Sequence, residues 1–182
     1  MEKNITMIAL FAALIAALGL IPKITLASGI PITAQSMGIM LCGTVLGAKR
    51  GALAVILFVG LVALGLPLLA GGRGGLGVFQ TPWAGFYWGF PVAAFVTGLI
   101  VEKWNGVQLR ISAIVAALVG GIGALYLVAV PYYMIAKPAG LGEAVTVAMA
   151  PFMPGDILKA IVAGLITAAL YRARPQAVLS RQ

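Results

Sequence analysis

The chain has 182 residues, of which 62% are hydrophobic and only 9% are charged. A soluble domain is roughly a quarter charged, so this composition excludes a soluble fold and predicts a single membrane domain over residues 1–182. The formal net charge of +8 comes from basic residues scattered between apolar runs, which indicates membrane topology rather than a nucleic-acid-binding face.

The residue types also exclude most catalytic chemistry. The sequence has no histidine, which removes imidazole metal sites and histidine-based nucleophile schemes. Its four acids are widely spaced and form neither a carboxylate pair nor an acidic metal-binding repeat. The single cysteine, Cys42, cannot form an internal disulfide and is interpreted as a small packing residue. We therefore expect no enzyme activity, no cofactor and no bound metal.

Six apolar runs follow one another along the chain, and a helix that crosses a membrane needs about 20 such residues. The first run, at about 4–22, closes at Pro22, and the segment 24–35 reads as a loop because Gly29 and Pro31 break it. The segment near 140–150 allows a short amphipathic piece. The sequence thus predicts an all-α bundle of six transmembrane helices at about 4–22, 34–48, 51–66, 82–101, 110–134 and 152–172.

Basic residues indicate how these helices are oriented. Six spans place both termini on one side, where eight Lys and Arg residues fall, against three on the other side and Lys159 within a span. Cytoplasmic loops carry an excess of Lys and Arg, so both termini are predicted to be cytoplasmic. The connections 23–33, 67–81 and 135–151 then face outward and converge on one outward-facing site.

The first expected helix has a face of small residues. At 100° per residue, one contiguous side carries Thr6, Ala9, Ala12, Ala13, Ala16, Ala17 and Gly19. In lipid, small side chains let another backbone approach closely. This spacing is compatible both with packing inside the chain and with docking of a separate membrane subunit.

Asp156 and Lys159 stand at the start of the last expected helix, in "PFMPGDILKA". Their spacing places them on the same side of a helix. Pro154 and Gly155 precede the acid, so Asp156 could be the N-cap residue with Lys159 as its counter-charge. Charged groups within a membrane span are costly and usually functional, which favours a ligand that carries N–H donors and a carboxylate.

The segment "AGGRGGLGVFQTPWAGFYWGFP" (70–91) combines glycines, a cation and aromatic residues. Glycines let backbone amides approach a ligand, and Arg73 can hold a carboxylate. Flat apolar walls would come from Phe79, Trp83, Phe86, Tyr87 and Trp88, although an interfacial aromatic belt collects the same residue types. The glycines do not form a nucleotide-binding fingerprint, because no βαβ context surrounds them.

Taken together, these segments resemble the BioY family, the biotin-binding membrane subunits (S components) of energy-coupling factor (ECF) transporters. The matching pieces are "GIPITAQSMGIMLCGTVLGAKRGALAVILFVGLVALGLPLLAGGRGG" (29–75), "TPWAGFYWGFPVAAFVTGLI" (81–100) and "PFMPGDILKA" (151–160). The resemblance covers nearly the whole chain. One departure is at 80–87, where family members often show Gly-Pro-Thr-Gly-Gly-Tyr and this chain reads "QTPWAGFY".

The resemblance implies high-affinity binding and uptake of biotin across the bacterial cytoplasmic (inner) membrane. It implies as partners a transmembrane coupling subunit, docked by Ala9, Ala13 and Ala16, and ATPase subunits. Asp156 would accept from the ureido N–H groups, and Lys159 or Arg73 would meet the carboxylate or the ureido oxygen. The expected substrate-binding set is Asp156, Lys159, Arg73, Gln35, Thr33, Gly75, Phe79, Trp83, Phe86 and Tyr87.

Two other functions stay open on the residues alone. The chain has no Walker A motif, so uphill transport would need energy from other subunits. A stand-alone small-molecule permease would use the same pocket without partners, and a structural subunit of a membrane complex would bind no ligand. Ligand binding separates the structural subunit from the transport functions, and co-purification with an ATPase module separates the two transport functions.

Overall fold

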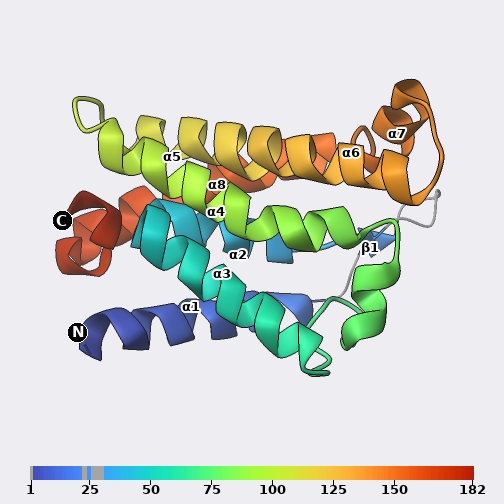
Figure 1. Ribbon diagram of the computed structural model, residues 1–182. Coiled ribbons are helices and arrows are strands. Elements are labelled where there is room, and N and C mark those ends of the chain that lie inside the picture. Colours follow the sequence, from blue (N-terminus) through green and yellow to red (C-terminus); the bar gives the residue numbers. More distant parts are fainter. Residues whose placement is uncertain (1, 22–23, 26–30) are drawn as a thin grey trace.

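The computed structural model describes residues 2–21, 24–25 and 31–182 (Figure 1). Its α-helices are α1 (Glu2–Gly19), α2 (Gln35–Leu41), α3 (Ala48–Ala63), α4 (Ala84–Lys103), α5 (Leu109–Leu118), α6 (Leu125–Ala136), α7 (Leu141–Ala148) and α8 (Met153–Ala173). Two π-helical segments, Cys42–Leu46 and Val119–Ala124, extend α2 and join α5 to α6. Short 3-10 turns occupy Leu76–Gln80, Pro175–Ala177 and Leu179–Arg181.

The helices agree with an all-helical membrane protein. Among the described residues, four helical stretches are long and apolar enough to cross a membrane: Glu2–Gly19, Ala84–Lys103, Leu109–Ala136 and Met153–Ala173. The helix expected at 34–48 is present as the shorter apolar stretch Gln35–Leu46, and the one expected at 51–66 is present as the 16-residue helix α3. The short piece near 140–150 is the helix α7.

The structure departs from the expected loop at 24–35. There β1 (Ile24–Thr25) and β2 (Pro31–Ile32) pair antiparallel, with Ile24 opposite Ile32. Pro22, Lys23 and Gly29, to which we assigned a helix end, an outward charge and a loop break, lie outside the described residues.

Both termini lie at one end of the bundle, and α7 and the β1–β2 ribbon lie at the other (Figure 1). Lys3 at the start of α1 donates from Nζ to the carbonyl of Gln176 at 2.8 Å, which ties the two termini together. The chain after α8 then packs against this end of the bundle, with Val178, Leu179 and Ser180 buried. This end of the molecule is therefore closed by the chain's own C-terminal segment, a feature that the sequence analysis did not predict.

The tight turn before α3 depends on a contact from α4. Gly47 adopts φ +86°, a conformation that favours glycine, and it has no side chain to cap the new helix. Glu102 of α4 fills that role, because its Oε1 accepts from the Ala48 N–H at 3.0 Å. A Cβ at Gly47 would collide with this carboxylate, so the Glu102 cap requires glycine at position 47.

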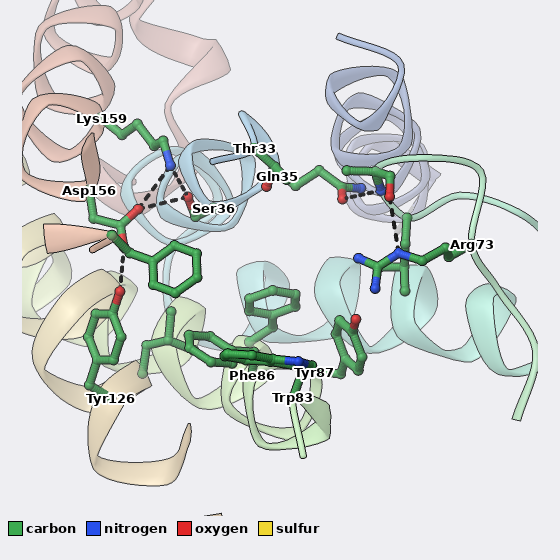
Figure 2. Close-up of a pocket in the computed structure, with 15 residues that line it drawn as sticks. Thr33, Gln35, Ser36, Arg73, Trp83, Phe86, Tyr87, Tyr126, Asp156 and Lys159 are labelled. Carbon is green, nitrogen blue, oxygen red and sulfur yellow. Dashed lines mark hydrogen bonds and ion pairs between the residues drawn. The ribbon is translucent and has the colours of Figure 1, made fainter. Parts of the chain in front are cut away.

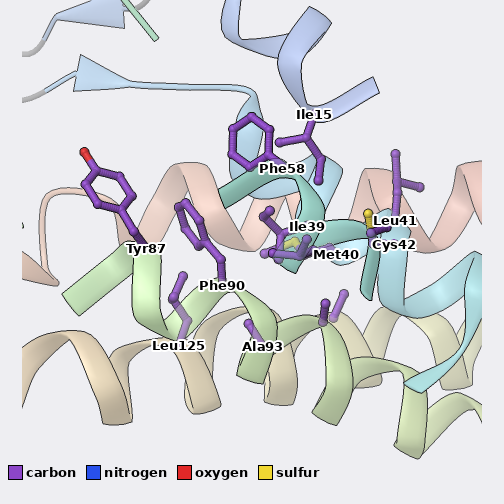
Figure 3. Packing of buried hydrophobic residues seen from close by; sticks show 14 of the residues in the cluster. Ile15, Ile39, Met40, Leu41, Cys42, Phe58, Tyr87, Phe90, Ala93 and Leu125 are labelled. Carbon is purple, nitrogen blue, oxygen red and sulfur yellow. The ribbon is translucent and has the colours of Figure 1, made fainter. Parts of the chain in front are cut away.

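The core gathers apolar side chains from most of the helices. Figure 3 shows Ile15 of α1 and Phe58 of α3 above the α2 residues Ile39 and Met40, with Phe90 of α4 beside them. The α2 stretch is central, since every residue of the π-helical segment is buried. Glycines bring the remaining helices close, as expected for membrane helices. These glycines are Gly89 against α6, Gly98 against the turn before α3, and Gly164 against α5.

The small-residue face of α1 is divided between two environments. Ala12 and Gly19 are buried together with the large residues Phe11 and Ile15, so they pack inside the chain. Ala9 and Ala13 are exposed. Internal packing therefore accounts for only part of this face, because the helix turns its Phe11–Ile15 side, and not its alanine stripe, toward the core. Ala16 is half-buried at the boundary and Ala17 is exposed.

Candidate small-molecule binding site

A pocket of about 320 Å³ (Figure 2) lies toward the end of the bundle opposite the termini. Pockets for small ligands are usually roughly 300–1,000 Å³, with apolar walls and a few polar groups. The lining comes from five places: the start of α2, the segment after α3, and the first parts of α4, α6 and α8. The lining residues are Thr33, Gln35, Ser36, Leu69, Ala70, Arg73, Trp83, Phe86, Tyr87, Phe90, Leu125, Tyr126, Phe152, Asp156 and Lys159.

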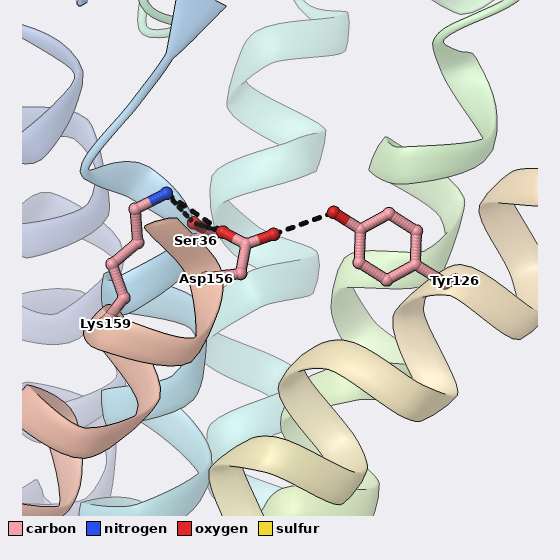
Figure 4. A network of polar contacts seen from close by, with 4 residues as sticks. All are labelled: Ser36, Tyr126, Asp156 and Lys159. Carbon is pink, nitrogen blue, oxygen red and sulfur yellow. Dashed lines mark hydrogen bonds and ion pairs between the residues drawn. The ribbon is translucent and has the colours of Figure 1, made fainter. Parts of the chain in front are cut away.

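One end of this pocket is a buried polar cluster (Figure 4). Asp156 is only 4% exposed. Its Oδ2 accepts from the hydroxyl of Tyr126 at 2.8 Å, and its Oδ1 accepts from Lys159 Nζ at 2.9 Å and from Ser36 Oγ at 3.2 Å. Lys159 Nζ also donates to Ser36 Oγ at 2.9 Å. Three helices, α2, α6 and α8, thus meet around one carboxylate.

The cluster corrects the interpretation of Asp156 as a helix cap. Helix α8 begins at Met153 with Phe152 as its N-cap residue, so Asp156 lies inside the first turn. Its side chain is bound by side chains rather than by backbone N–H groups. The helix can start before Asp156 because Pro154 is tolerated in the first turn, where the N–H that proline lacks would have no partner in the helix. Lys159 is the counter-charge, as the cap interpretation expected.

The same cluster keeps spare hydrogen-bonding capacity next to the pocket. A carboxylate can accept about four hydrogen bonds and a lysine ammonium can donate three. Within the described part of the chain, Asp156 accepts three and Lys159 donates two. One acceptor position, on Oδ2 of Asp156, and one N–H of Lys159 therefore remain, and this pair fits a ligand group that offers both a donor and an acceptor.

Gln35 lines the pocket, but its amide is engaged with backbone. Its Oε1 accepts from the Ala70 N–H at 2.9 Å, and its Nε2 donates to the carbonyls of Leu68 at 2.9 Å and Ile15 at 3.2 Å. Both amide hydrogens are thereby used. The side chain fastens the segment 68–70 to α1 and α2, and so fixes the position of Arg73 three residues later.

Arg73 lies at the other end of the pocket from the Asp156–Lys159 pair (Figure 2). Its Nε donates to the Ala70 carbonyl at 3.2 Å, which holds the side chain against its own loop. Its two terminal nitrogens form no ion pair with a carboxylate among the residues that the structure describes, and they lie toward the Tyr87 hydroxyl (Figure 2). The guanidinium is exposed at the mouth and is free to pair with an anion.

An aromatic wall connects these two ends, made of the α4 N-cap residue Trp83, of Phe86, Tyr87 and Phe90 in α4, and of Phe152 and Tyr126. The ring centroids lie 6.3 Å apart for Trp83 and Phe86, 5.7 Å for Phe86 and Tyr126, and 5.9 Å for Tyr87 and Phe90. Such spacing is typical of tilted and edge-to-face aromatic pairs. A flat apolar ring could lie against this surface between the polar ends.

Two of the predicted site residues do not line the pocket. Phe79 packs behind the wall, with its ring 5.6 Å from Tyr87 and 5.2 Å from the exposed Trp88. Gly75 serves the turn before the 3-10 segment Leu76–Gln80, with φ +82°. The 3-10 turn carries both away from the cavity. The other predicted residues line it: Asp156, Lys159, Arg73, Gln35, Thr33, Trp83, Phe86 and Tyr87.

Several lining residues were missed by the sequence analysis, namely Ser36, Leu69, Ala70, Phe90, Leu125, Tyr126 and Phe152. Ser36 directly follows Gln35, so its position was a usable signal. Tyr126 stands within a long apolar run that also contains Tyr132 and Tyr133, and nothing local distinguishes the three.

The fold and the site define a multi-pass helical membrane protein with a ligand-sized pocket between the ends of its helices. Comparison with known proteins then gives the family. Residues 2–176 match the family model described as the BioY family. The chain belongs to the BioY family.

Named relatives support this assignment over the full length. The chain is 51% identical over 189 aligned positions, covering all of both chains, to the biotin transporter BioY of Rhodobacter capsulatus. It is 48% identical, over 90% of each chain, to the biotin transporter BioY of Rhizobium etli. The fold is similar to the crystal structure of the S-component for biotin from an ECF-type ABC transporter, with a TM-score of 0.86, 30% identity, and coverage of 94% of this chain and 92% of that one.

Proposed function

We propose that this chain is the biotin-specific S component of an ECF transporter in the bacterial cytoplasmic membrane. The observation that carries the proposal is the order of chemical groups along the pocket. A polar end with a spare acceptor and a spare donor is followed by an aromatic wall and then by a guanidinium that has no acidic partner among the described residues. Biotin carries a ureido ring, an apolar thioether ring and a carboxylate in the same order.

The ureido ring is proposed to bind at Asp156. Its N–H fits the remaining acceptor position of that carboxylate, and its carbonyl fits the remaining N–H of Lys159. Trp83, Phe86 and Tyr87 then hold the thioether ring. Gln35 acts by positioning the loop, Thr33 contributes to the pocket lining, and Phe79 and Gly75 support the wall from behind.

The carboxylate is proposed to pair with Arg73 rather than with Lys159. Lys159 is already held by an acid and a hydroxyl, and a second carboxylate near Asp156 would be repelled. Arg73 has no carboxylate partner among the described residues and lies at the pocket mouth. A flexible acid chain could reach it from the aromatic wall while remaining near water.

We infer one membrane domain with six transmembrane helices and both termini in the cytoplasm. The adjacency of the two termini agrees with an even number of crossings, and eight of the twelve basic residues fall on the terminal side. Gln35–Leu46 and α3 are proposed to supply the two shorter crossings. The pocket then faces outward, where a substrate arrives.

The exposed alanines of α1 are proposed to dock the transmembrane coupling subunit of an ECF module, which carries its own ATPase subunits. Ala9 and Ala13 leave a shallow surface on which another helix backbone could approach closely, and Ala16 lies at its edge. No bulky side chain would have to be displaced from these positions.

The proposal is tested by equilibrium binding of labelled biotin to the purified chain. We expect one saturable site per chain and a loss of about 2–5 kcal/mol for Asp156→Asn, which leaves Lys159 without its counter-charge and exchanges an acceptor for a donor. A correctly folded wild-type chain without saturable binding would contradict the proposed function. Co-purification with a coupling subunit and ATPases tests the assignment to an ECF transporter.

A further inference from the structure

A second hollow lies at the end of the bundle that carries the termini, on the outer surface between α1, α3 and α4. We call it the basic groove, and its lining is Asn4, Ala48, Lys49, Arg50, Phe95, Leu99, Glu102 and Lys103. It shares no residue with the candidate biotin pocket. The proposed function leaves it without a role.

The charges of the basic groove are unbalanced. Its single acid, Glu102, is engaged in capping α3 through the Ala48 N–H. Arg50 is also engaged, since its guanidinium donates to the carbonyls of Leu46 and Leu179 at 3.0 Å each and to Asn4 at 3.4 Å. Lys49 and Lys103 are exposed and form no hydrogen bond or ion pair with any described residue. Two free ammonium groups therefore flank a groove whose other charged residues are already occupied.

An apolar stripe leads away from these lysines along α4. Leu99, Phe95, Val92 and Trp88 are 37%, 40%, 41% and 53% exposed. Their spacing of four, three and four residues places them on one side of the helix. From Leu99 to Trp88 the stripe spans about 16 Å at 1.5 Å per residue, and half of a bilayer's hydrocarbon core is about 15 Å. The stripe thus has the depth of one leaflet.

We propose that the basic groove binds one anionic phospholipid of the adjacent leaflet. The headgroup phosphate lies between Lys49 and Lys103, and an acyl chain follows the α4 stripe from Leu99 toward Trp88. Basic pockets of this kind recognise anionic headgroups, while large apolar side chains pack against acyl chains. A helical partner fits less well, because Trp88 and Phe95 would keep its backbone away.

The test is lipid binding to the purified, delipidated chain, followed by native mass spectrometry with phosphatidylglycerol or phosphatidylcholine of identical acyl chains. We expect tighter binding of phosphatidylglycerol. In the double variant Lys49→Gln/Lys103→Gln this binding should weaken roughly 20- to 30-fold. Each lysine near the lipid surface contributes a factor of about five, and the two factors multiply. The matched control Arg110→Gln/Arg174→Gln removes two exposed charges from the same end, outside the groove, and should bind within about twofold of wild type.

A competition with glycerol phosphate, the headgroup chemistry without acyl chains, checks the role of the stripe. We expect it not to displace the bound lipid. Three results would overturn the proposal: equal losses in both double variants, equal binding of the two lipids by the wild type, or displacement by glycerol phosphate as effective as by lipid. Equal thermal unfolding midpoints for both double variants in detergent, where no lipid is added, exclude misfolding as the cause of a loss.

Discussion

The hydroxyl of Tyr126 in α6 donates a hydrogen bond to Oδ2 of Asp156 in α8 at 2.8 Å, and both residues are buried, at 4% exposure each. This bond fixes one oxygen of the carboxylate and leaves Oδ1 to Lys159 and Ser36. A buried charge is tolerated only when its partners are well placed. Tyr126 therefore sets the direction in which the remaining acceptor position of Asp156 faces the pocket.

Tyr126→Phe should weaken biotin binding while preserving the pocket's shape. Removing the hydroxyl leaves a buried carboxylate oxygen without its donor, which costs about 1–3 kcal/mol. We expect both a lower unfolding midpoint and a higher dissociation constant for biotin. The matched control is Tyr132→Phe, whose hydroxyl donates to the Phe79 carbonyl at 3.3 Å, away from the pocket lining. Equal biotin affinity in the two variants would contradict a positioning role for Tyr126.

Gln35→Met should lower the affinity for biotin indirectly, by loosening the loop that positions Arg73. The change preserves side-chain length but leaves the Ala70 N–H and the Leu68 carbonyl without their partner, at about 1–3 kcal/mol each. We expect the loop to loosen and biotin affinity to fall. In an Arg73→Gln background the same change should have little further effect on affinity, because the cation that the loop positions is already gone. Full additivity of the two changes would argue for direct ligand contact by Gln35.

The orientation of the chain is tested with an impermeant thiol reagent. In a Cys42→Ala background, single cysteines at positions 73 and 50 report the two ends of the bundle. Reagent added outside intact cells should modify the cysteine at 73 and leave the one at 50 unmodified. Modification of position 50 alone would reverse the proposed topology. Permeabilised cells provide the control that position 50 can react.

The α1 face predicts opposite outcomes for neighbouring alanines. Ala13 is exposed, so Ala13→Trp should fold and bind biotin but should no longer co-purify with a coupling subunit. Ala12 is 3% exposed, so Ala12→Trp should overpack the core and destabilise the chain by about 1–3 kcal/mol or more. Co-purification of the Ala13→Trp variant at wild-type levels would place the docking surface elsewhere.

The sequence allowed the helices and most of the pocket to be predicted, because lipid imposes long apolar runs and because loops on one side converge. It did not allow the inward side of each helix to be identified. Tyr126 lies in a uniformly apolar run, and only packing against α8 distinguishes it from its neighbours. The cap alternative for Asp156 remained open because "PG" before it suggested a later helix start, whereas Pro154 is accommodated inside the first turn. Phe79 was expected in the pocket because it is one of the aromatic residues of the segment 70–91, but a 3-10 turn places it behind the aromatic wall.

The most direct test of the proposed binding mode is a titration of purified Arg73→Gln and Lys159→Met with biotin and with a biotin amide that lacks the carboxylate. If the carboxylate meets Arg73 and the ureido ring meets the Asp156–Lys159 end, Arg73→Gln should weaken biotin by about 1.5–3 kcal/mol and affect the amide little, since a charge-assisted hydrogen bond is lost. Lys159→Met should weaken both ligands to the same extent. A larger loss for biotin than for the amide in Lys159→Met, with equal losses in Arg73→Gln, would contradict this account and reverse the ligand in the pocket.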